Sequence, residues 1–330
     1  MRPRCSINMR DAPMETAPNC PIKVLAIDGG GIRGIIPAII LGAFEKALAK
    51  PLHKVFDLIA GTSTGGIIAL GLGTKCKGDG PYTSGDLLEL YVQNGPAIFR
   101  RQLLTVIRQV FRPKYSPAAL ESILTKYFGD TVFSSALTNL LISSYNLQSQ
   151  LPFFFKSERA KSDPDYDWKV RDIARATSAA PTFFPPFHLQ SGAQDYALVD
   201  GGVFANNPAM AAYAEARHVY PEAQQYLVVR VGTGDRQDHI SFAAARNWGL
   251  LPWAKQIVPV FMDSVSEAVD YELNQLPSCA YHMFQPSLEG ASNEMDDVSA
   301  ENLSNLQSLA NRYVQSAAKQ IADACEDLAA

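Results

Sequence analysis

The sequence GTSTG at residues 61–65 places Ser63 between two glycines and at the joint between two apolar runs. A serine on a sharp turn between a strand and a helix stands above the sheet, with strained backbone angles that bulky neighbours would obstruct. Gly61 and Gly65 would remove that obstruction. The amides and the positive dipole end of the following helix would then point at Ser63. The spacing predicts a nucleophile, and the alternative is a glycine-rich turn with an idle serine.

A second motif, DGGGIRG at residues 28–34, follows the apolar run KVLAI and precedes a helical pattern. Its backbone amides would be free to bind an anion, such as the tetrahedral oxyanion of acyl transfer. Gly30 and Gly31 are the candidate donors, with Arg33 as a nearby positive charge. The motif also fits the Gly-x-Gly-x-x-Gly pattern of dinucleotide-binding folds, but no acidic residue closes the next strand, and the Lys-Ser/Thr of a P-loop is absent.

A third motif, LVDGGVFANNP at residues 198–208, delivers Asp200 at the end of an expected strand. Gly201 and Gly202 follow it and would let other groups approach closely. Functional residues gather at the carboxyl ends of parallel strands in α/β folds, so Asp200 is a candidate partner for Ser63. The alternative is an aspartate that merely caps a Gly-Gly turn.

A Ser-Asp-His hydrolase would also need a histidine to accept the serine proton. The candidates are His218, His239 and His282, and none lies in a setting typical of a catalytic histidine, although His239 is the least implausible. We therefore expect Asp200 to accept the proton from Ser63 directly. Because an aspartate of ordinary pKa is a weak base, partial burial that raises its pKa would help.

Short apolar runs that alternate with helical patterns predict an α/β layered fold. The expected strands are IKVLAID, VFDLIAG, NLLISSYNL, PFFFK, YALVDGG, QYLVVRVGTG and CAYHMFQ. Helices are expected at residues 35–49, from Ser116-Pro117 onward, and as one long amphipathic helix from Ser299. We expect a flexible leader over residues 1–20 and a single domain over residues 21–330.

The composition argues against a nucleic-acid-binding, a zinc-binding and a membrane-spanning protein. A formal net charge of -4 argues against a nucleic-acid-binding protein, and the basic stretch at 100–114 is interrupted by apolar residues. The five cysteines match neither a zinc-finger spacing nor a Cys-x-x-Cys motif, so we expect reduced thiols and no metal site. No signal peptide and no run of membrane-spanning length is found, which predicts a cytoplasmic protein.

These motifs, in this order, resemble the patatin-like family of lipid acyl hydrolases. Further similar segments are NGPAIF at 94–99, TSAAPTFFPP at 177–186 and NEMDDVSAEN at 293–302. The resemblance implies a three-layer α/β/α fold with a mostly parallel sheet and peripheral helices. It also implies Ser63 and Asp200 as a catalytic dyad, Gly29, Gly30 and Gly31 as the oxyanion hole, and hydrolysis of fatty acyl esters without a metal or cofactor.

By the same resemblance, the substrate would be a phospholipid or galactolipid, cleaved as by a phospholipase A during transient contact with a membrane surface. The segment NWGLLPWAKQIVPVFM at 247–262 could face the membrane, because Trp favours the interface, or could be ordinary core. Two alternatives stay open. One is a cyclic-oligonucleotide-activated antiviral effector that degrades membranes, and the other is a storage protein with negligible turnover.

Overall fold

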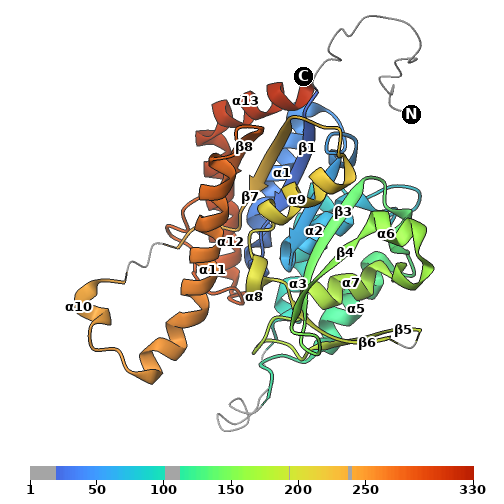
Figure 1. Ribbon diagram of the computed structural model, residues 1–330. Coiled ribbons are helices and arrows are strands. Elements are labelled where there is room, and N and C mark those ends of the chain that lie inside the picture. The colour runs from blue at the N-terminus through green and yellow to red at the C-terminus, as the bar shows by residue number, and fades with distance from the viewer. Residues whose placement is uncertain (1–19, 101–111, 193, 237–239) are drawn as a thin grey trace, which may run out of the picture.

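The computed structural model describes residues 20–100, 112–192, 194–236 and 240–330. Within these ranges eight strands form one sheet with helices on both faces, as Figure 1 shows, so the predicted α/β fold is confirmed. Apart from Cys20, the expected leader lies outside the described residues. The strands are β1 (Ile22–Ile27), β2 (Leu58–Thr62), β3 (Asn139–Asn146), β4 (Leu151–Lys156), β5 (Phe187–Ser191), β6 (Gln194–Asp200), β7 (Tyr226–Val231) and β8 (Cys279–Phe284).

The strand order is β5-β6-β3-β2-β1-β7-β8, with β4 paired beside this path to β3. Strands β3, β2, β1, β7 and β8 run parallel, whereas β4, β5 and β6 are antiparallel to their neighbours. The sequence analysis missed β5. Its sequence FHLQS buries only Leu189, so it lacks the apolar run that identifies the central strands.

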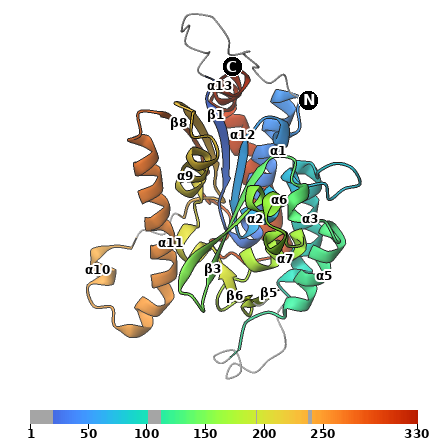
Figure 2. The same cartoon turned by 45° about the vertical axis from the view of Figure 1, so that its right-hand side comes forward.

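The core lies on both faces of the sheet, because successive strand residues point to opposite sides. Leu25 and Ile27 of β1 belong to one apolar cluster, and Val24 and Ala26 belong to the other. The first face is covered by helices that include α1, α2, α3 and α12, and the second by α9 and part of α11. Figure 2 shows the sheet between these two helical layers, which gives the expected three-layer arrangement.

The helices are α1 (Ile35–Leu48), α2 (Thr64–Gly73), α3 (Ser84–Ile98), α5 (Pro117–Phe128), α6 (Ser157–Ser162), α7 (Val170–Thr177), α8 (Gly202–Ala205), α9 (Ala209–Val219), α10 (Phe242–Ala245), α11 (Leu250–Asn274), α12 (Ala300–Ser316) and α13 (Ala318–Ala329). The expectation of one long C-terminal helix was wrong. The chain turns at Ala317, so that both α12 and α13 pack against α1. None of the helices in the described ranges combines the length and the apolar character needed to cross a membrane.

Candidate active site

Ser63 occupies the turn between two buried elements. Strand β2 ends at Thr62 and helix α2 begins at Thr64, and Ser63 between them has φ 55° and ψ −121°, in the left-handed half of the map that costs a non-glycine residue energy. Its amide donates a hydrogen bond to the Thr177 hydroxyl at 2.9 Å, and that hydroxyl donates to the Ser143 carbonyl at 2.7 Å. The strained backbone is therefore held by a neighbouring strand and helix.

The two glycines around Ser63 are required by close backbone approach. A Cβ atom on Gly61 would lie 2.2 Å from the Gly65 carbonyl oxygen, and one on Gly65 would lie 2.1 Å from the Ile27 carbonyl oxygen. Any side chain at either position would force the backbone apart. The glycine spacing thus reflects the geometry that the sequence predicted, and it also brings α2 against the end of β1.

Asp200 reaches Ser63 through strand register. Thr62, the last residue of β2, pairs with Ser143 of β3. Strand β3 continues beyond the end of β2, and β6 pairs with this continuation. In that pairing Asp200 lies opposite Ser144. Ser63 and Asp200 therefore lie at the same height along β3. We expected Asp200 on a parallel strand, and this was wrong: β6 is antiparallel and descends onto the extension of β3.

The carboxyl group of Asp200 is buried, and its charged form is favoured by the nearby side chain of Ser63. Burial raises its pKa to about 7, although the Ser63 side chain and the hydrogen bond from the Gly202 amide at 2.8 Å act in the opposite direction. Gly201 lets β3 approach, since a Cβ there would lie 2.2 Å from the Ser143 hydroxyl. The site thus holds a carboxyl group that gains and loses its proton near neutral pH.

The glycine loop after β1 lies directly beside Ser63. A Cβ on Gly29 would lie 3.3 Å from the Ser63 Cβ, and the Gly29 amide donates to the Asn206 carbonyl at 3.0 Å. Among the described residues, the amides of Gly30 and Gly31 make no hydrogen bond. These two amides are available to an anion, whereas that of Gly29 is already engaged.

Arg33 stabilises the glycine loop from within the protein. It is buried, and its Nε donates to the Gly30 carbonyl at 3.4 Å. Burial lowers the pKa of Arg33 to about 10, with Asp263 acting in the opposite direction, so that the side chain stays charged at neutral pH. Arg33 therefore fixes the Gly30 peptide group and adds positive charge near the loop.

The histidines in the described ranges are not placed to act as a base for Ser63. His188 and His282 pair with Asp195 and Asp327, and His218 is exposed in the last turn of α9. His53 precedes the amino end of β2, the end of that strand opposite Ser63. His239 lies outside the described residues. Ser63 therefore has Asp200, and none of these four histidines, as its ionisable neighbour.

A buried ionic network lies under the glycine loop and was not predicted. Arg230 of β7 binds the carboxylate of Asp28 through its Nε, at 3.0 Å and 3.2 Å, and its other end pairs with Asp270 of α11. Asp270 also accepts a hydrogen bond from Asn207 at 3.0 Å. Burial disfavours the charged guanidinium, but attraction to Asp28 and Asp270 outweighs it and raises the pKa of Arg230.

Some of these residues carried a signal in the sequence and others did not. Arg230 is a charge inside the apolar run YLVVRV, and a charge that must be buried needs a buried partner. Asn206, whose side-chain oxygen is buried without a hydrogen-bond partner in the described structure, belongs to the NNP sequence of the third motif. Thr177 begins the segment TSAAPTFFPP, but its contact with the Ser63 amide had no signal of its own, because it depends on tertiary packing.

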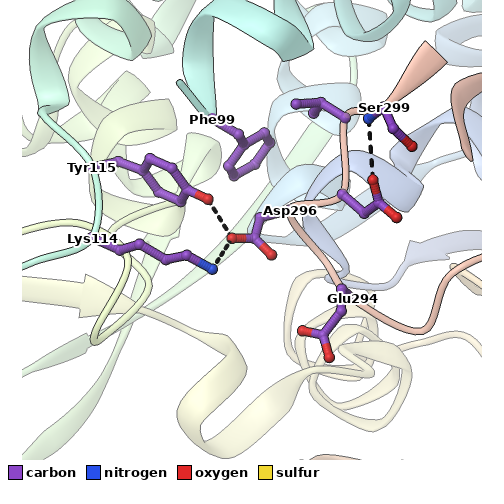
Figure 3. Close-up of a pocket in the computed structure, with 8 residues that line it drawn as sticks. Phe99, Lys114, Tyr115, Glu294, Asp296 and Ser299 are labelled. Atoms are coloured by element: carbon purple, nitrogen blue, oxygen red, sulfur yellow. Dashed lines mark hydrogen bonds and ion pairs between the residues drawn. The ribbon is translucent and has the colours of Figure 1, made fainter. Parts of the chain in front are cut away.

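A cavity of about 440 Å³ opens outside the glycine loop. Figure 3 shows Lys114 and Tyr115 pointing toward Asp296, which accepts hydrogen bonds from both. Neither Ser63 nor Asp200 lines this cavity. Its wall supports the loop, because the Met295 carbonyl accepts the Ile32 amide at 2.9 Å.

The fold and this site define an α/β protein in which a serine on a strained turn faces a buried carboxyl group. A family model described as patatin-like phospholipase matches residues 25–213. The chain therefore belongs to the patatin-like phospholipase family, and this membership supports lipid hydrolase activity. In the described ranges, no group of three or more His, Cys, Asp or Glu residues is placed to hold a metal ion.

Two plant proteins agree with this assignment. The chain is 32% identical over 330 residues to "Patatin-like protein 2" of Oryza sativa subsp. indica, covering 86% of this chain and 82% of that protein. It is 31% identical over 349 residues to "Patatin-like protein 1" of Arabidopsis thaliana, covering 92% and 84%. Among solved structures it is similar to human GIVD cytosolic phospholipase A2, with a TM-score of 0.47, 13% identity and coverage of 94% and 60%.

Burial of Asp200 makes the stability of the protein depend on pH. Between its ordinary pKa of 3.8 and its folded value of about 7, the unfolded carboxyl is ionised while the native one keeps its proton. The native state then binds more protons, so the free energy of unfolding should fall as pH rises through this window, by about 4 kcal/mol at most. Urea unfolding of the wild type and Asp200→Asn at pH 5 and pH 8 measures this effect, and an unchanged difference between the two chains would contradict it.

Loss of Arg230 should destabilise the fold strongly. Arg230→Met would leave Asp28 and Asp270 buried without a counter-ion, which typically costs about 3 to 5 kcal/mol. Arg159→Met is the matched control, because Arg159 pairs with Asp163 on the surface and should lose about 1 kcal/mol or less. Chemical denaturation compares the two variants, and equal losses would show that the buried network contributes little.

Proposed function

We propose that this protein is a lipid acyl hydrolase of the phospholipase A type that works through a Ser63–Asp200 dyad. The observation that carries the proposal is the position of Ser63, on a strained turn beside a buried carboxyl group whose pKa is raised to about 7. Within the described ranges, two amides of the adjacent glycine loop make no hydrogen bond. Membership of the patatin-like phospholipase family supports a lipid ester as the substrate.

In the first step the Ser63 hydroxyl attacks the acyl carbonyl carbon while Asp200 accepts its proton. A carboxylate with a pKa near 7 is a stronger base than an ordinary aspartate and is ionised in a large fraction of molecules at neutral pH. The carbonyl π electrons move to oxygen, which forms a tetrahedral oxyanion. The amides of Gly30 and Gly31 stabilise that oxyanion, and each such donor is typically worth about 3 kcal/mol in the transition state.

The oxyanion then collapses, the ester bond to the leaving alcohol breaks, and Asp200 returns its proton to the alcohol oxygen. Asp200 takes a proton from a water molecule as its oxygen attacks the acyl-serine. Collapse of the second oxyanion breaks the bond to the Ser63 oxygen and releases the fatty acid, and Asp200 returns the proton to Ser63. Apart from the substrate and this water, every step uses groups that the chain itself supplies.

Phospholipid is the substrate class that the family description supports most directly, and galactolipid stays a prediction. The cyclic-oligonucleotide activator, the antiviral role and the storage role also stay predictions, and no contact among the described residues adds support to them. A cytoplasmic location with action at membrane surfaces is part of the same proposal.

Substitution of either dyad residue should abolish hydrolysis. We expect Ser63→Ala and Asp200→Asn each to lower the rate on a soluble short-chain ester by about three orders of magnitude or more, because they act as a unit. His188→Asn and His282→Asn serve as controls and should keep wild-type rates. If Asp200→Asn stays active while His239→Ala is inactive, the dyad is wrong.

The pH profile should report the ionisation of Asp200. Only the ionised carboxylate can accept the Ser63 proton, so kcat/KM on a soluble ester should rise with pH and level off above about pH 7. Steady-state rates across the range, corrected with Ser63→Ala for background hydrolysis, test this. A flat profile from pH 5 to pH 9 would argue against Asp200 as the base.

A further inference from the structure

A set of large apolar side chains is exposed on one projecting segment of the molecule. The arm, residues 240–262, comprises α10 and the first half of α11, and Figures 1 and 2 both show it extending away from the layered body. Leu250 is 85% exposed and Leu251 78%. The other exposed large apolar side chains of the arm are Ile240, Phe242, Trp253, Val258 and Phe261.

Three of these side chains lie on one face of α11, and the whole arm has a basic composition. Leu250, Val258 and Phe261 recur at the helical spacing that places them on one side of α11. From residue 240 to 262 the sequence contains two basic residues and no acidic residue. An apolar face with basic flanks is complementary to a bilayer that carries anionic headgroups. Its two tryptophans, Trp248 and Trp253, pack edge to face at 5.4 Å and are of the type that favours the interface.

The base of the arm joins the active site. A Cβ on Gly202, two residues after Asp200, would lie 3.6 Å from the Met262 Cε, and α11 packs against α8. Asp263 comes next and interacts electrostatically with Arg33 of the glycine loop. Val203 of α8, three residues after Asp200, also exposes an apolar side chain. A lipid surface in contact with the arm would therefore lie beside the site where its ester bond is to be cleaved.

We propose that the arm docks this protein on the surface of anionic phospholipid membranes by inserting Leu250, Leu251 and their apolar neighbours among the lipids. This inference rests on the proposed function for its purpose, since the membrane would then supply the substrate. The docking itself needs only the exposed apolar side chains and the positive charge of the arm.

Vesicle binding tests the docking in the full chain with Ser63→Ala, which prevents lipid consumption. The probes are vesicles of phosphatidylcholine with and without phosphatidylglycerol. Leu250→Ser/Leu251→Ser should lower the vesicle partition coefficient about tenfold or more, because two apolar side chains no longer leave water. Leu151→Ser is the matched control, since Leu151 is 60% exposed at the start of β4, outside the arm, and binding should not change. Arg246→Ser should weaken binding about threefold to fivefold on anionic vesicles alone.

Tryptophan fluorescence gives an independent measurement that needs no substitution in the arm. The chain has three tryptophans, and Trp168→Phe removes the buried one outside the arm. Emission from Trp248 and Trp253 should shift to the blue with anionic vesicles and be quenched by brominated lipid. Equal vesicle binding by the wild type and the double leucine variant, without a blue shift, would overturn the docking.

Two further outcomes distinguish membrane docking from the proposed hydrolase function and from dimerisation through the arm. If wild-type chain with Ser63 intact hydrolyses no soluble ester but Ser63→Ala binds vesicles as expected, the proposed function fails and the docking stands. If sedimentation instead shows a dimer that Leu250→Ser/Leu251→Ser dissociates, and vesicles are not bound, a second copy covers the arm and the docking is overturned. The double variant should also keep the soluble-ester rate of the wild type while losing vesicle hydrolysis.

Discussion

The burial of Asp200 beside the Ser63 side chain is the constraint on which the site depends. A carboxylate in water would be a poor base for a serine hydroxyl, and burial is what raises its pKa to about 7. Burial of a charge is also costly, so the fold must hold this carboxyl group where it can still be ionised. It does so with few donors: the Ser63 side chain and the Gly202 amide, both of which act on the charged form.

Close backbone approach provides the rest of the geometry. The end of β1 and the start of α2 meet closely because Gly65 lies against the carbonyl oxygens of Ile27 and Asp28. Gly201 allows an equally close approach to Ser143 of β3. Such tight packing requires support from outside, and Arg230 supplies it by joining Asp28 before the glycine loop to Asp270 on α11. Buried pairs of this kind are weak contributors to net stability but costly to break, so they fix geometry more than they add stability.

The sequence predicted the central strands, the helix after Ser63 and the positions of the three motifs, because each has a local cause in apolar periodicity or glycine spacing. It did not predict that β6 is antiparallel or that α12 ends at Ser316, since both depend on how distant elements pack. Edge strand β5 was missed for the related reason that an exposed strand has little apolar pattern. Strand register places Asp200 level with Ser63, and register between strands distant in sequence cannot be obtained from one chain alone.

Helix α11 links the surface of the protein to its site. Its first half carries the exposed apolar side chains. Met262 lies next to Gly202, and Asp263 interacts with Arg33. Further along the helix, Asp270 binds Arg230 and Asn207 in the interior. A helix is stiff along its hydrogen-bonded axis, although Pro259, within the arm, removes one backbone donor. The buried half can therefore help to keep the glycine loop in place while the first half exposes its apolar side chains. Separate anchoring of the two halves explains how one helix can serve both an exposed apolar face and a rigid site.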